Sequence, residues 1–73
     1  MDVARLTYMA NQIARNLAAG GEDAAIAATA QHIVKYWEPR MKAAILAGDR
    51  SALEPIARAA VERLERVAGI EPA

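Results

Sequence analysis

His32, Tyr36 and Trp37 lie in one short stretch and are the side chains best suited to form a functional site. His32 is the only histidine in the chain, and a histidine can act as a general base when a nucleophile or a second titratable group lies beside it. The chain has no cysteine, and its single serine, Ser51, is better explained as a helix cap. The sequence therefore predicts no catalytic residue.

The acidic and glycine residues around position 21 do not form a cofactor or metal motif either. Gly20 and Gly21 lack the pattern that follows them in a phosphate-binding loop. The adjacent carboxylates Glu22 and Asp23 fit stabilisation of a helix N-terminus better than acid–base chemistry. Without cysteine, a thiolate-bound metal or iron–sulfur cluster has no ligand here. We expect neither a cofactor nor a metal in this chain.

The stretch around Tyr36 has the composition of a protein-binding surface. Tyr36 and Trp37 are adjacent, so on a helix their side chains point about 100° apart. Trp37 fits an apolar stripe and is predicted to anchor the core, whereas Tyr36 falls with Thr29 and His32 on a flank near Arg40. Because Tyr, Trp and Arg dominate binding hot spots, Tyr36 and Arg40 are predicted to contact a partner protein. The alternative is that Tyr36 is a partly exposed neighbour of the core and contacts no partner.

Asn11 and Gln12 form a second polar group, on the first predicted helix. Amide side chains suit a solvated surface and a buried polar contact equally well, so both interpretations stay open. The predicted partner interface comprises Asn11, Gln12, His32, Tyr36 and Arg40.

Charge and composition exclude several classes of function. Nine Lys and Arg balance nine Asp and Glu along 73 residues, so the chain lacks the basic field that supports nucleic-acid binding. It shows neither a secretory leader nor an uncharged stretch long enough to span a membrane, and we expect a soluble, cytoplasmic protein with no membrane contact. Its length predicts a single helical domain over residues 1–73 with a thin core and marginal stability.

Apolar residues recur at three- and four-residue steps, which predicts an all-α fold, a small bundle of three to four helices. The first helix is expected from about Val3 to Ala19 and the second from Glu22 to near Trp37, where Pro39 breaks it. Alanines in the second helix allow another backbone to approach closely. The expected stripes are Val3, Leu6, Ala10, Ile13 and Leu17; Ile26, Ala30, Ile33 and Trp37; Met41, Ala44 and Ile45; and Leu53, Ile56, Ala60, Leu64 and Val67.

The third helix should start at Pro39 and run for about nine residues, until Gly48 and Asp49 break it. Two starts are possible for the last helix, because Ser51 and Glu54 resemble a capping box while Pro55 suits a first helical position. Its expected end is at Gly69 and Pro72. Solvated i,i+4 ion pairs are expected on its outer face, at Glu54–Arg58 and Glu62–Arg66.

Two short motifs together resemble a known family. They are Met9-Ala-Asn-Gln-Ile-Ala14 in the first helix, and the combination of His32, Tyr36-Trp37 and Pro39-Arg-Met41 at the proline break. The second is similar to the His, aromatic-Trp, Pro-Arg-Met pattern in the delta subunits of cytoplasmic, NAD-dependent, molybdenum-containing formate dehydrogenases. The family often continues with aromatic residues after the first motif, where this chain has Arg15, Asn16 and Leu17.

The resemblance implies a non-catalytic accessory subunit that supports assembly, stability or cofactor maturation of the formate-oxidising large (alpha) subunit. It implies that partner subunits carry bis-molybdopterin guanine dinucleotide, iron–sulfur clusters and FMN. Two alternatives remain from the residues alone. One is a free-standing helical interaction module, which includes a homodimer; the weaker one is a small DNA-binding bundle, which the balanced charge disfavours.

Overall fold

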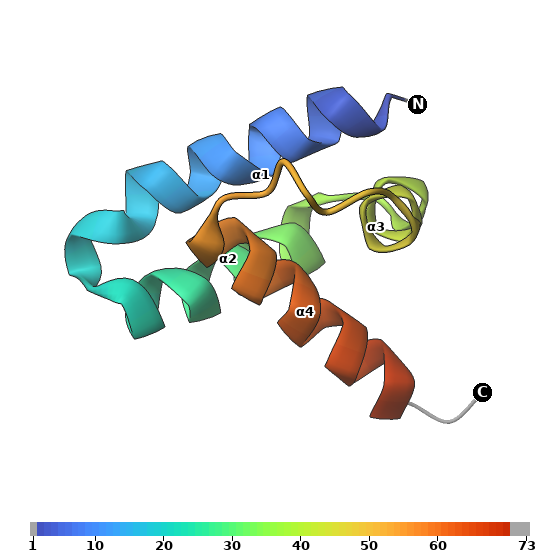
Figure 1. The fold of residues 1–73 in the computed structure, drawn as a ribbon. Coiled ribbons are helices and arrows are strands. Elements are labelled where there is room, and N and C mark those ends of the chain that lie inside the picture. Colours follow the sequence, from blue (N-terminus) through green and yellow to red (C-terminus); the bar gives the residue numbers. More distant parts are fainter. Residues whose placement is uncertain (1, 71–73) are drawn as a thin grey trace.

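The computed structural model describes the backbone of residues 2–70 and the side chains of residues 2–67. The elements are α1 (Val3–Leu17), a 3-10 turn (Ala18–Gly20), α2 (Glu22–Tyr36), α3 (Pro39–Ala47) and α4 (Pro55–Ile70). These residues contain four α-helices and no strand, which confirms the predicted all-α class. In Figure 1, α1 and α2 run antiparallel, α4 crosses in front of α2, and α3 lies at one end of the pair.

The turn between α1 and α2 depends on glycine at one position. Gly21 has a φ of 101°, in the left-handed region that side chains with a Cβ rarely adopt. The α-helix gives way to a 3-10 turn after Leu17, two residues before the predicted end at Ala19. The second helix begins at Glu22 as predicted, with Glu22 and Asp23 in its first turn, where carboxylates favour the positive end of the helix dipole.

The proline break lies where the sequence predicted it. Trp37 and Glu38 are both extended, with ψ values of 135° and 162°. For Glu38 this follows from Pro39, which disfavours helical geometry in the residue before it. Pro39 is the first residue of α3, a position at which its missing N–H has no helical partner in any case. The chain therefore turns after α2 and places α3 across the end of the α1–α2 pair (Figure 1).

The start of α4 resolves the two alternatives in favour of Pro55. Ser51 is not the cap of this helix, so that prediction is wrong. Instead, the Ser51 backbone N–H and hydroxyl both donate to the Asp49 carboxylate, at 2.9 Å and 3.0 Å, and hold the loop after α3. The helix also continues through Gly69 to Ile70, past the first expected stop. The other expected stop, Pro72, lies outside the described residues.

Small and aliphatic side chains from all four helices form the core. On α1 and α4 the buried face is rotated relative to the predicted stripe. On α1, Ala14 is buried. On α4, Ala57 and Val61 are fully buried, whereas Val67 is 49% exposed. The rotation follows from packing, because a face of small residues lets α4 come close to α2. The core side chains are Leu6, Ala10, Ala14, Ile33, Trp37, Ile45, Leu53, Ala57, Val61 and Leu64.

Close packing also explains a glycine at the end of α3. A Cβ on Gly48 would lie 2.5 Å from Val3 Cγ1 and 3.1 Å from the Ala44 carbonyl oxygen. The first distance is too short for any Cβ contact and the second is tight, so a side chain at position 48 would force the Val3 side chain to move. The glycine that was expected only to break the helix therefore also leaves room for Val3 of α1 beside the end of α3.

Trp37 is 5% exposed and is the largest side chain in this core. Replacing it by alanine should cost about 3–5 kcal/mol, which is comparable to the whole stability of so small a domain. We expect Trp37→Ala to lose most of its helical circular dichroism at 37 °C. The matched control is Tyr36→Ala, because Tyr36 is 67% exposed and its removal should change the unfolding free energy by less than about 0.5 kcal/mol. A Trp37→Ala chain as stable as this control would contradict the assignment.

Candidate functional site

The aromatic ledge is formed by His32 and Tyr36, one helical turn apart near the end of α2. Their ring centroids are 4.8 Å apart with a tilt of 44°, and the Lys35 ammonium lies 5.9 Å from the Tyr36 centroid. His32 is half-buried and Tyr36 is 67% exposed. Their rings border a shallow hollow whose other walls are Leu17, Ala28, Gln31 and Lys35. The ledge thus presents a preformed aromatic pair with a cation beside it.

Thr29 does not belong to this exposed flank, contrary to the sequence-based expectation. It is fully buried, and its hydroxyl oxygen has no hydrogen-bond partner among the described residues. Thr29 lies one turn before His32, as the helical spacing predicted. At that point along α2, however, this face of the helix packs against the rest of the bundle. The ledge therefore begins at His32.

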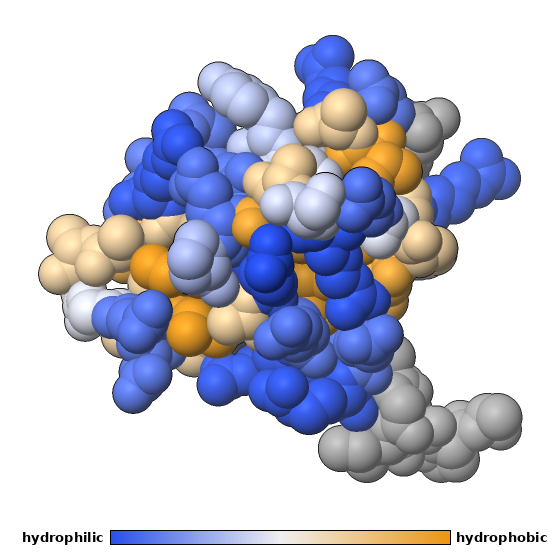
Figure 2. All heavy atoms as spheres, in the orientation of Figure 1, coloured by the Kyte–Doolittle hydropathy of each residue, from blue (hydrophilic) through white to orange (hydrophobic). Residues whose placement is uncertain are grey.

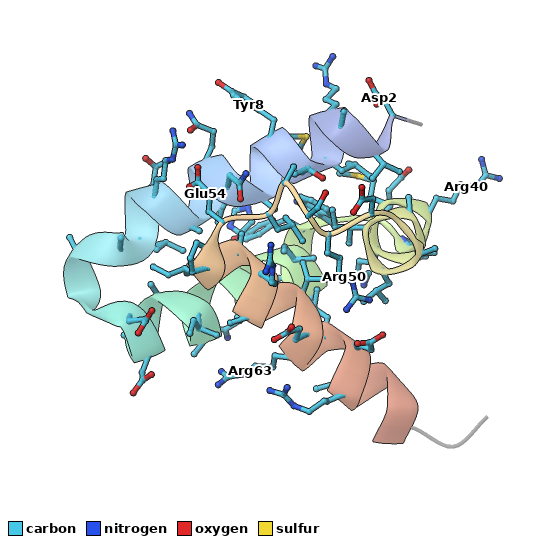
Figure 3. The ribbon with its side chains drawn as sticks, viewed as in Figure 1. Asp2, Tyr8, Arg40, Arg50, Glu54 and Arg63 are labelled. Atoms are coloured by element: carbon cyan, nitrogen blue, oxygen red, sulfur yellow. The ribbon has the colours of Figure 1, made fainter. Side chains whose placement is uncertain are left out.

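Arg40 lies beyond the proline break, in the first turn of α3. Its side chain is exposed and extends away from the body of the molecule in Figure 3. It borders a hollow with Glu38 and Pro39, separate from the hollow beside His32. The break thus puts Arg40 on a different helix from Tyr36 while keeping the two close in sequence.

Asn11 connects α1 to the loop before α4. Its Nδ2 donates to the Ala52 carbonyl at 3.0 Å, and its Oδ1 accepts from the Glu54 backbone N–H at 2.9 Å. The neighbouring Gln12 accepts from Arg15 Nη1 at 3.4 Å. Both amides are half-buried, so each makes a polar contact within the chain and also keeps part of its surface in solvent. Neither of the two open interpretations describes them fully.

Glu54 extends the same connection to the side chain of Arg15. Arg15 donates from Nε and Nη2 to the two carboxylate oxygens of Glu54, and this contact lowers the pKa of Glu54, mainly through the hydrogen bond. The expected Glu54–Arg58 pair is therefore wrong: Glu54 pairs with α1, and Arg58 donates to the carbonyls of Arg50, Ser51 and Leu53. Figure 3 shows Glu54 beside α1, where the loop passes it.

A second ion pair closes the other end of that loop. Arg50 donates to both Glu65 oxygens at 3.0 Å, and its Nη2 also donates to the Leu46 carbonyl at 2.7 Å, at the end of α3. The hydrogen bonds from Arg50 lower the pKa of Glu65. The predicted Glu62–Arg66 pair is not among the two ion pairs found within the described residues, and Glu65 on the same helix is paired instead.

An apolar groove is the feature that sequence reasoning missed. It lies between the end of α2, α3 and the second half of α4, and its lining is aliphatic except for one lysine. Two of the exposed large hydrophobic residues border it, with Val34 52% exposed and Val67 49% exposed. The lining residues are Val34, Pro39, Lys42, Ala43, Leu46, Leu64 and Val67.

The groove was missed because each helix contributes only one or a few of its residues. Val67 was assigned to the core from its spacing, and Val34 lies outside the predicted stripe of α2. On α2, Val34 and Tyr36 differ by about 200° in helical angle, so the groove and the ledge lie on opposite flanks of that helix. The sequence alone could not indicate the groove, because the residues that join Val34 in it lie on α3 and α4 and come together only through tertiary packing.

The described residues contain no group of three or more His, Cys, Asp or Glu side chains that could hold a metal ion. No helix among residues 2–70 combines the length and apolar character needed to cross a lipid bilayer. Figure 2 shows that the face seen in Figure 1 is largely hydrophilic, with apolar side chains visible in separate small areas.

These features define the class: a small all-helical protein whose exposed aromatic and aliphatic side chains suit contact with another protein. Comparison with family models then gives the particular family. The model of the NADH-dependent formate dehydrogenase delta subunit, FdsD, matches residues 5–61, and the chain belongs to this family. The match includes both motifs on which the resemblance rested. Comparisons with curated proteins and with solved structures gave no match.

The Arg50–Glu65 pair predicts how stability depends on pH. The pKa of Glu65 is lower in the folded chain than its ordinary value of 4.5, so its contribution is present above about pH 4.5 and is lost as the pH falls through the folded-state pKa. Glu65→Gln should therefore lose less stability than wild type between about pH 5 and pH 3. Urea unfolding followed by circular dichroism measures this. Glu62→Gln, which leaves the pair intact, is the control, and equal pH dependence in all three chains would contradict the prediction.

Proposed function

We propose that this chain is a non-catalytic accessory subunit of a cytoplasmic, NAD-dependent formate dehydrogenase complex and binds the large, formate-oxidising (alpha) subunit. The observation that carries the proposal is the match of the delta-subunit family model to residues 5–61. The chemistry of the chain supports it, because the sequence has no cysteine and the hydroxyl of its only serine donates to Asp49. His32 packs against Tyr36 rather than against a nucleophile.

In this proposal the redox groups belong to the partner subunits, which carry bis-molybdopterin guanine dinucleotide, iron–sulfur clusters and FMN. Iron–sulfur clusters need thiolate ligands, and this chain has none to give. The accessory subunit then acts by binding one state of the large subunit better than another, which stabilises that state by mass action. We propose that the stabilised state is the one that accepts or retains the molybdenum cofactor.

Two exposed features support binding to another protein. Tyr36 and Arg40 are residue types that often dominate interfaces, and both side chains are exposed. They lie on either side of the proline break, at the end of α2 and the start of α3. Asn11 and Gln12 contribute less in this view, because their amides already take part in contacts within the chain.

Reversing the charge of Arg40 tests whether this residue contacts the large subunit. Arg40→Glu should leave the helical content unchanged, because the side chain is exposed. It should weaken binding to the large subunit by about tenfold or more, since it places an unpaired or like charge at the contact. Titration of the large subunit with the purified chain measures the change. Arg66→Glu, which reverses an exposed charge on α4, is the matched control. If both variants bind with wild-type affinity at low ionic strength, where charge effects are least screened, Arg40 is not part of the interface.

Deleting the chain from cells tests the proposed role itself. Complex purified from the deletion strain should contain large subunit that is depleted in molybdenum and oxidises formate poorly. The NADH-oxidising flavin activity should survive, because the proposed contact is with the formate-oxidising subunit. Metal analysis and the two activity assays measure this on one preparation.

The outcomes of the deletion separate three explanations. Restored molybdenum content on re-expression of the chain would support the maturation role. Full loading in a complex that dissociates on dilution would support a structural role only. Full loading, normal turnover and an intact complex would contradict the accessory function.

A further inference from the structure

We propose that the apolar groove between α2, α3 and α4 binds an amphipathic helix of the partner, with an aliphatic stripe and an acidic flank. This inference rests on the proposed function, since the partner is a subunit of the formate dehydrogenase complex. It adds a second contact surface, on the flank of α2 opposite to His32 and Tyr36.

The first argument for the proposal is that the groove exposes large apolar side chains. Val34 on α2 and Val67 on α4 are 52% and 49% exposed, and they stand on two different walls. The lining also includes Leu64, which belongs to the core, and Leu46, which is half-buried and packs against the core, so the groove adjoins the core directly. Aliphatic side chains inserted here would cover two large hydrophobic residues that are otherwise open to water, and burial of apolar surface is the main driving force of association.

The groove presents mainly side chains, rather than free backbone hydrogen-bonding groups, to an occupant. Within α2, α3 and α4 the backbone groups are paired in helical hydrogen bonds, the Val34 carbonyl in the last turn of α2 accepts from Lys42, and the described residues contain no strand edge. An occupant must therefore satisfy its own backbone, which a helix does and an extended segment does not. A helix with aliphatic side chains at i, i+3 and i+4 meets this requirement.

The charge of the groove indicates which residues should lie beside the aliphatic stripe of the incoming helix. Lys42 is the one charged residue that lines the groove; its ammonium donates to the Val34 carbonyl at 3.3 Å and has further N–H donors available. No carboxylate is among the lining residues. On the neighbouring elements, Glu65 pairs with Arg50, and Glu38 borders the separate hollow with Arg40. A lining whose one charge is a lysine favours Asp or Glu on the incoming helix.

The same charge argues against a second copy of this chain as the occupant. A two-fold contact centred on the groove would bring the Lys42 side chains of both copies together, because the same patch is used on both sides. Like charges placed together inside an interface are unfavourable. A partner with acidic residues has no such penalty.

The test measures the affinity of the full chain for purified formate dehydrogenase complex that lacks the delta subunit. Val34→Glu combined with Val67→Glu should raise the Kd by about a hundredfold, and Lys42→Glu by about tenfold. Lys42→Arg keeps the charge and should stay within about threefold of wild type. Tyr8→Glu is the matched control, because Tyr8 is a 64% exposed hydrophobic residue on α1 that points away from the bundle in Figure 3. Circular dichroism of each variant verifies folding.

A photo-crosslinking amino acid at Ala43 identifies the occupant on the same complex. We expect attachment to a helical segment of the partner with aliphatic and acidic residues. Wild-type affinity of the groove variants, with the wild-type chain still bound, would overturn the groove proposal and leave the proposed function standing. Crosslinking of Ala43 to a second copy of this chain would also overturn it. Failure of the wild-type chain itself to bind the complex would overturn both.

Discussion

The close approach of α2 and α4 is the contact on which the rest of this structure depends. Of all the helix pairs, these two are in the most extensive contact. Both bury small side chains: Ala25 on α2 is 1% exposed, and Ala57 and Ala60 on α4 are fully buried. Each helix is therefore rotated so that these alanines lie in the interior. On α4 this rotation buries Val61 and leaves Val67 on the edge. The apolar groove is thus a consequence of the packing, and so is its position beside α3.

The proline break at Pro39 is a second feature on which this arrangement depends. It ends α2 directly after Tyr36, at a point where Trp37 is buried in the core and the adjacent Tyr36 remains in solvent. It also turns α3 across the end of the bundle, where Ile45 packs inward and Ala43 borders the groove. The break therefore lies directly beside both the tryptophan of the core and the tyrosine of the ledge.

Polar contacts fasten the long loop between α3 and α4 at both ends. Near α4, Asn11 and Arg15 of α1 bind the loop through Ala52 and Glu54. Near α3, Arg50 joins the last turn of that helix to Glu65. Exposed ion pairs are individually weak, so these contacts are better regarded as fixing the direction of α4 than as a main source of stability. They also explain why polar residues of α1 are half-buried in a chain with so few buried polar groups.

The sequence by itself determined the helices, because glycine, proline and apolar spacing act within a few residues. It placed the start of α2 at Glu22, the break at Pro39 and the aromatic pair at the end of α2, and its motifs indicated the family. Tertiary structure alone decided how each helix is rotated. A shift of one position, from Ile56 to Ala57 as a core residue of α4, changes which side chains are buried, and helical spacing cannot distinguish two neighbouring stripes when alanines are frequent. The partners of Asn11 and Glu54 were also undetermined, since residues about forty positions apart meet only when the bundle closes. For the same reason the groove, whose walls come from three helices, exists only in the folded chain.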